Sequence, residues 1–119
     1  MVEPEVLVRV TVSHYLRECG YRVVEAVSAD EALVILQAPD IQVSVVLCTV
    51  HLPGAMNGFG LAKWVRAKLP NIDVILATNG TQSAKAAGDL CEEGPTLTKP
   101  YDHKLLADQI KRLLASRSK

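Results

Sequence analysis

The run Val43–Cys48 constrains the fold most, because it is an apolar segment of strand length that ends in a sharp turn. A continuous apolar run of this length is typical of a strand that is buried on both faces of a sheet. Thr49 follows the run, and Pro53-Gly54 and Asn57-Gly58 then mark a loop. Strands of this kind occur in parallel sheets that helices cover on both sides, so the run predicts an α/β domain.

Helix and strand patterns alternate along the rest of the chain. Ser28 is expected to cap the helix that follows it, since Glu31 completes a capping box. The expected helices are residues 29–37, 59–69 and 83–91 and one that begins at Asp102; the expected strands are residues 21–27, 43–48, 72–77 and 95–98. The alternation predicts one domain over residues 1–119, with a parallel sheet that helices cover.

Charge and hydropathy exclude several classes of function. Thirteen basic and thirteen acidic side chains give no net charge, which argues against a nucleic-acid-binding surface built from bulk charge. No apolar run approaches the ~20 residues of a membrane span, and the first residues do not resemble a secretory leader. We therefore expect a cytoplasmic protein. Its three cysteines, Cys19, Cys48 and Cys91, are expected to be reduced thiols. A nucleophilic Cys48 is the alternative.

The amino-terminal segment supports two interpretations. Valines alternate with other residues between Val6 and Val12, as in a strand. Yet Pro4 suits the first turn of a helix and Gly20 suits a helix end, so residues 4–19 also fit a helix. Periodicity leaves both interpretations open.

Several motifs, in their order and spacing, resemble the receiver domain of bacterial two-component response regulators. They are residues 21–26 followed by 28–33, then Leu52-Pro53-Gly54 with Asn57-Gly58, and finally Lys99-Pro100-Tyr101. The resemblance implies a doubly wound parallel sheet in a flavodoxin-like three-layer sandwich. The strand order is 2-1-3-4-5, with five helices and a site at the carboxyl edge of the strands. It also favours the helix for residues 4–19.

The resemblance further implies a phosphorylation site that is incomplete in this chain. In the family, an acidic pair and an acceptor aspartate hold Mg²⁺, and a lysine and a hydroxyl bind the phosphoryl oxygens. Lys99 matches the lysine, Thr78 the hydroxyl and Glu3 the first acid, whereas Pro4 replaces the second acid and Thr49 replaces the acceptor. We therefore expect no catalytic residue, no bound Mg²⁺ and only a vestigial phosphate site.

Members of that family begin with an apolar first strand in the middle of the sheet. This chain begins at Met1-Val2, so the strand is expected to be missing, with a gap between the second and third strands. Three solutions are open. The natural chain starts upstream, a second copy supplies a strand in a swapped dimer, or residues 5–12 form the central strand.

The leading functional hypothesis is a degenerate receiver in phosphorelay signalling that binds partners and is not an enzyme. Its expected partners are a histidine kinase or a downstream effector, with no direct nucleic-acid or membrane contact and a homodimer as a possibility. The expected partner surface includes residues 79–93. The alternative is a phosphorylatable receiver with a non-standard acceptor. A nucleotide or thiol enzyme ranks last, since the chain has no Gly-rich phosphate loop and no CxxC motif.

Overall fold

The structure, a computed structural model, describes residues 1–93 of the chain. The elements in order are α1 (Val6–Glu18), α2 (Ala29–Gln37), β1 (Val45–Thr49), α3 (Gly58–Lys68), β2 (Asp73–Ala77) and α4 (Gly80–Glu93). The expected strand 95–98, the helix expected from Asp102 and the candidate site residue Lys99 lie outside the described residues.

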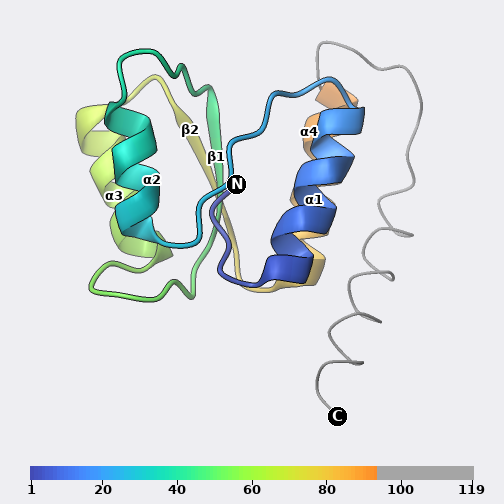
Figure 1. Cartoon of the computed structure of the whole chain (residues 1–119), viewed down its shortest axis with the longest axis horizontal. Helices are drawn as coiled ribbons and strands as arrows, with labels where there is room; N and C mark the ends of the chain where they lie inside the picture. The colour runs from blue at the N-terminus through green and yellow to red at the C-terminus, as the bar shows by residue number, and fades with distance from the viewer. Residues whose placement is uncertain (94–119) are drawn as a thin grey trace.

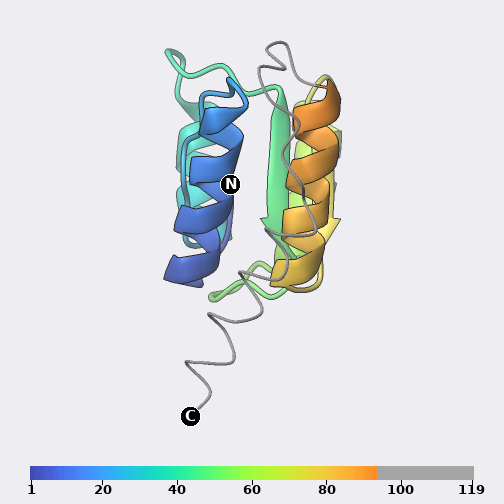
Figure 2. The ribbon, with the colours of Figure 1, turned by 90° about the vertical axis from the view of Figure 1, so that its right-hand side faces the viewer.

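The two strands pair in parallel, with Val45 opposite Asp73 and Thr49 opposite Ala77. Helices α2 and α3 cover one face of this sheet, and α1 and α4 cover the other (Figures 1 and 2). A parallel pair needs a crossover connection, and α3 provides it between β1 and β2. The predicted three-layer α/β architecture is therefore confirmed, although only two regular strands form within the described part of the chain.

Strand β1 lies at the centre of the core and divides its side chains between the two layers. Leu47 packs with α1 and α4, whereas Val46 and Cys48 pack with α2 and α3. All three side chains are buried, as the continuous apolar run predicted. The other residues of the two layers' clusters include Val8, Val12, Leu16, Ala84 and Ala87 on one side and Ala29, Ala32, Leu61 and Val65 on the other.

The amino-terminal segment is helix α1, so the interpretation of residues 5–12 as a strand is wrong. Val8 and Val12 lie one turn apart and are buried, whereas Val6 and Val10 on the other side are 56% and 50% exposed. The alternating valines thus fall on two faces of a 3.6-residue helix. Gly20, with φ at 98°, ends the segment in a conformation that favours glycine. No helix within residues 1–93 is long and apolar enough to cross a bilayer.

Polar side chains fix the starts of three helices. Ser28, Asn57 and Asn79 each accept a hydrogen bond from the backbone N–H three residues further on, over 3.2, 2.9 and 2.9 Å. Such caps satisfy amides that have no partner inside the helix. The cap at Asn79 explains why α4 begins at Gly80, three residues before the predicted start at Ser83.

The expected strand at residues 21–27 does not form as a regular strand. Only Ala26 pairs, in an isolated parallel bridge with Val2. A regular strand needs a paired neighbour along its length, and among residues 1–93 the segment has a single bridge. The segment remains as the connection from α1 to α2.

Met1–Glu3 occupies one end of the gap in which the missing first strand would lie. Val2 forms parallel bridges with both Ala26 and Cys48. Its N–H donates to the Leu47 carbonyl over 2.8 Å, and its carbonyl accepts from the Thr49 N–H over 3.1 Å. Val2 therefore closes the predicted gap at the end nearest the carboxyl edge.

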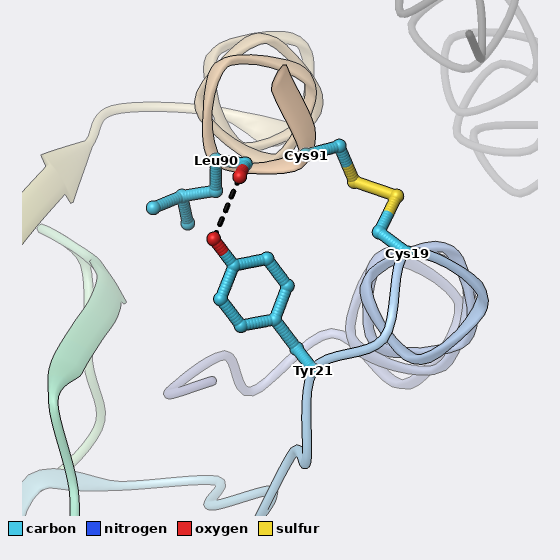
Figure 3. The surroundings of a disulfide bond; sticks show 4 residues. All are labelled: Cys19, Tyr21, Leu90 and Cys91. Atoms are coloured by element: carbon cyan, nitrogen blue, oxygen red, sulfur yellow. Dashed lines mark hydrogen bonds between the residues drawn. A yellow bond between two sulfur atoms is a disulfide. The ribbon is translucent and has the colours of Figure 1, made fainter. Parts of the chain in front are cut away.

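The expectation of three reduced thiols is wrong for two of them, because Cys19 and Cys91 form a disulfide. The bond joins the end of α1 to the last turn of α4 (Figure 3). Beside it, the Tyr21 hydroxyl donates to the Leu90 carbonyl over 2.6 Å. The two cysteines are 72 positions apart, and only the packing of α1 on α4 brings them together. Cys48 is a free, buried thiol.

We expect loss of the disulfide to destabilise the fold. A bridge that closes a long loop restricts the unfolded chain, and its removal costs about 2–4 kcal/mol. The measurement is urea unfolding of three samples: the oxidised chain, the chain with dithiothreitol, and the Cys19→Ser/Cys91→Ser variant. The oxidised chain should have the highest unfolding midpoint, and the other two should have similar, lower midpoints. A midpoint that the reductant leaves unchanged would contradict the bridge.

Candidate functional site

The ends of the parallel elements form one edge of the sheet, and most of the predicted site residues lie there. Thr49 is the last residue of β1, and Thr78 directly follows β2. Glu3 and Pro4 follow Val2, which pairs beside Cys48. The structure thus places Glu3, Pro4, Thr49 and Thr78 at the same edge, as expected for a doubly wound sheet.

Thr49 is buried at the centre of this edge. Only 6% of its surface is exposed, and its N–H is bonded to Val2. Its carbonyl accepts a hydrogen bond from the Cys48 thiol, with sulfur and oxygen 3.1 Å apart. A threonine hydroxyl at this position is neutral at pH 7, so the centre of the edge carries no carboxylate.

Glu3 is held as part of the entry to α1. Its Oε2 accepts a hydrogen bond from the Glu5 N–H over 3.0 Å, and its carbonyl accepts one from Arg9 Nη1 over 3.0 Å. The residue is 4% exposed. Burial raises the pKa of the Glu3 carboxyl, and the Glu5 charge raises it further, while the bond from the Glu5 N–H and the charge of Arg9 oppose this. The Glu3 carboxyl therefore acts as a hydrogen-bond acceptor for the backbone just before α1.

Arg9, which the sequence did not single out, connects this turn to the segment after α1. Its Nε lies 3.2 Å from Glu25 Oε1, and Arg17 Nη2 lies 3.1 Å from the other oxygen of the same carboxylate. Two arginines on one helix thus hold Glu25, which precedes the residue that pairs with Val2. The i, i+8 spacing of Arg9 and Arg17 on one helix face was the available sequence signal.

The surface next to Pro4 is mainly apolar. A shallow depression of about 610 Å³ is lined by Pro4, Val50, His51, Leu52, Pro53, Asn57 and Phe59. Phe59 is 59% exposed there. Within residues 1–93, no three histidine, cysteine, aspartate or glutamate side chains gather in a way that could hold a metal ion.

Thr78 is engaged by the first turn of α4. Its Oγ1 donates to Gln82 Oε1 over 2.7 Å, and its N–H donates to the same oxygen over 2.8 Å. One amide oxygen therefore holds both groups of the threonine. Gln82 was not predicted, and its position four residues after Thr78 was the only sequence signal.

Cys48 is not set up as a nucleophile. Burial raises the pKa of its thiol to about 12, which keeps it protonated at neutral pH. A thiol reacts through its thiolate, so the alternative of a reactive cysteine at the strand tip finds no support.

Comparison with known proteins identifies the family. The model of the response regulator receiver domain matches residues 1–111. The chain belongs to the response regulator receiver family. No curated protein matches the chain. The α/β architecture and the site at the carboxyl edge fit a receiver domain of two-component signalling, and the resemblance drawn from the sequence motifs is confirmed.

The structure explains why a glycine stands at position 58, the first residue of α3. Its N–H donates to the Val50 carbonyl over 2.9 Å. A Cβ at this position would collide with the Thr49 carbonyl oxygen and would lie 2.8 Å from the Val50 Cα. Helix α3 thus rests directly on the backbone at the end of β1, which only glycine permits.

We expect Gly58→Ala to destabilise the domain by about 1–3 kcal/mol, because backbone atoms cannot move aside cheaply. Gly60→Ala is the matched control in the same helix turn. There the added methyl meets the flexible Met56 side chain, and alanine favours the helix by about 1 kcal/mol. Equal losses in the unfolding midpoints of the two variants would contradict the backbone contact.

We expect Glu3 to make stability depend on pH. Its pKa is higher in the folded state than in the unfolded chain, so below the unfolded value of about 4.5 both states are protonated and no penalty exists. As the pH rises through the folded pKa, ionisation costs the folded state stability.

Glu3→Gln keeps an acceptor for the Glu5 N–H and removes that cost. Its free energy of unfolding relative to wild type should therefore be higher at pH 7 than at pH 4. Glu92→Gln, at an exposed position of α4, serves as the control. A Glu3→Gln variant with the wild-type pH profile would show that this carboxyl is not the titrating group.

Proposed function

We propose that this receiver is degenerate and acts as a protein-interaction module in phosphorelay signalling, without phosphoryl transfer to position 49. The observation that carries the proposal is Thr49, which is buried at the end of β1 where the resemblance puts the acceptor aspartate. An acyl phosphate requires a carboxylate nucleophile. A threonine hydroxyl gives a stable ester instead, and it needs a base to become nucleophilic.

The nearest matched acid does not supply that base. Glu3 accepts the Glu5 N–H, and burial favours its protonated form. Pro4, which stands where the second acid is expected, has no oxygen in its side chain and lines the apolar depression. These features support a role of Glu3 in starting α1 and not in catalysis.

The same residues do not fit the Mg²⁺ ion that receivers of this family bind. Mg²⁺ prefers carboxylate and carbonyl oxygens in a nearly octahedral arrangement. Of the three positions matched to carboxylates, only Glu3 has one, and its Oε2 is already bonded to the backbone. We infer that Mg²⁺ binding is lost, and we derive no step through the ion.

A partner that binds α4 would find this helix held in one position at both of its ends. Gln82, Lys85, Asp89 and Glu92 form an exposed polar stripe along this helix. The disulfide holds the last turn of α4 on α1, and Gln82 holds Thr78 at its first turn. This surface therefore does not depend on a phosphoryl group, which suits constant binding of a histidine kinase or an effector.

The location of the protein stays a prediction. The sequence favours the cytoplasm, whereas the disulfide argues against a reducing compartment, where thiols are usually kept reduced.

Intact-mass analysis tests the proposal. The chain is incubated with acetyl phosphate and Mg²⁺ beside Thr49→Ala and an active receiver as the positive control. We expect no added phosphoryl group on either form of this chain. We also expect no change in its melting temperature with Mg²⁺ and a phosphate mimic.

A phosphoryl adduct that acid and base both cleave would overturn the proposal. An adduct present in the wild type and absent from Thr49→Ala would establish the alternative, a receiver with a non-standard acceptor.

A further inference from the structure

The Cys19–Cys91 bridge lies at the end of the domain opposite to the carboxyl edge. Helices α1 and α4 both start near that edge, just after Glu3 and Thr78, and the bridge joins the residues at their far ends (Figures 1 and 3). The residues matched to phosphoryl chemistry therefore take no part in it. The bridge also lies outside the core that β1 forms with α2 and α3, whose cluster of buried residues contains neither of the two cysteines.

The α1 half of the bridge is fixed by backbone hydrogen bonds. Cys19 is the C-cap of α1, and its N–H donates to the carbonyls of Tyr15 and Leu16 over 3.2 and 3.1 Å. The Tyr21 N–H returns to the Leu16 carbonyl over 3.1 Å, across Gly20 with its positive φ. Such bonds satisfy the last carbonyls of a helix. The position of Cys19 therefore does not depend on the bridge.

The α4 half has less support from packing. The buried residues that α4 adds to the cluster shared with α1 are Ala84, Ala87 and Cys91. An alanine buries little apolar area. Gly88 lies inside α4, and a glycine in a helix interior weakens the helix relative to alanine. Within residues 1–93, the bridge and the residues beside it therefore hold the last turn of α4 on α1.

Tyr21 provides a non-covalent tie beside the bridge. Its hydroxyl donates to the Leu90 carbonyl over 2.6 Å, reaching α4 from the segment after α1 (Figure 3). That carbonyl is one of the last four of α4, which have no partner inside the helix. The Leu90 side chain is also partly buried against the α1–α4 cluster. When the bridge is reduced, these contacts keep Cys91 close to Cys19, so that the two thiols can pair again.

The bridge lies just beneath the surface. Cys19 and Cys91 are each 4% exposed, whereas their neighbours Gly20 and Glu92 are exposed. Opening of the last turn of α4 therefore suffices to expose the sulfurs, and the α2–α3 layer need not unfold. Local opening of this kind occurs where few apolar contacts hold a segment.

The chemistry that the bridge can undergo is thiol–disulfide exchange. One thiol of a dithiol attacks the bridge as a thiolate, forms a mixed disulfide and releases one cysteine, which takes up a proton. The second thiol of the dithiol then displaces the other cysteine, which is also protonated. The bridge gains two electrons and two protons, and the dithiol loses the same number as it becomes a disulfide.

We propose that the Cys19–Cys91 bridge is a redox-input site of this receiver, which a protein dithiol reduces and a disulfide forms again. In the reduced chain the last turn of α4 opens, while β1, β2, α2 and α3 stay folded. In a compartment that keeps thiols reduced, a disulfide is usually transient and often senses redox state, which fits the cytoplasm that the sequence predicts.

Reduction also changes the surface of α4. Asp89 and Glu92 belong to the exposed stripe at this end of the helix. Opening of the last turn displaces them, so a partner that binds the stripe would distinguish the oxidised chain from the reduced one. This step alone rests on the proposed function.

Hydrogen–deuterium exchange of the full, folded chain tests the proposal without denaturant. The oxidised chain is treated with thioredoxin, its reductase and NADPH. We expect two new thiols, which alkylation maps to Cys19 and Cys91. The amides of residues 89–93 should then exchange at least about tenfold faster, because the bridge no longer stabilises the closed form, while those of β1 and α3 keep their rates. Oxidised glutathione should restore the bridge and the slow exchange.

Three variants separate the bridge from its neighbours. Tyr21→Phe keeps the ring and removes the bond to Leu90, so exchange at the end of α4 should rise about fivefold in the reduced chain and little in the oxidised one. Cys19→Ser/Cys91→Ser should exchange like the reduced chain with or without reductant. Cys48→Ala is the control; it removes the free thiol and should leave the redox response unchanged.

Three results would sink the redox-input site. Thioredoxin fails to reduce the bridge unless the chain is unfolded, or the end of α4 exchanges equally in both redox states. In the third, reduction accelerates exchange throughout β1 and α3, which would make the bridge purely structural. A phosphoryl adduct at Thr49 would overturn the proposed function and leave the redox-input site in place, so the two failures are distinguishable.

Discussion

The two-sided pairing of Val2 is the constraint on which the rest of the structure depends. Glu5, three positions after Val2, is the N-cap of α1, which starts at Val6. Because Val2 lies between Ala26 and Cys48, the segment ahead of α1 runs through the middle of the sheet. This pairing fixes α1 on one face of β1, and the segment after α1 crosses back to α2 on the other face (Figure 1). It also places Glu3 at the end of β1.

A second tie holds the layer that α1 and α4 form. Small side chains at Ala84 and Ala87 allow α4 to approach α1 closely, and the Cys19–Cys91 bridge joins the ends of both helices. Each alanine buries little apolar area, so the packing of α4 on α1 contributes little stability by itself. The disulfide between the two helices adds to it. The layer formed by α2 and α3 has no such bridge and relies on the larger side chains Leu61 and Val65.

The receiver architecture is retained, with Glu3, Pro4 and Thr78 at its carboxyl edge. The Glu3 carboxyl accepts a hydrogen bond from the Glu5 N–H, and Pro4 lines an apolar depression. The Thr78 hydroxyl donates a hydrogen bond to Gln82. Each of these groups makes a contact that serves the fold.

The sequence alone determined the α/β class, a buried central strand and the capped start at Ser28, because local periodicity and capping chemistry act within a few residues. The strand forms at Val45–Thr49, so the predicted bounds of Val43–Cys48 are shifted. From the order of the motifs we also predict that Thr49 stands at the position of the acceptor. Only the tertiary structure decided that Cys19 meets Cys91, that Val6 and Val10 face outward, and that Met1–Glu3 enters the sheet. Those outcomes depend on contacts between residues far apart in the chain, and local patterns carry no information about which distant neighbours will meet.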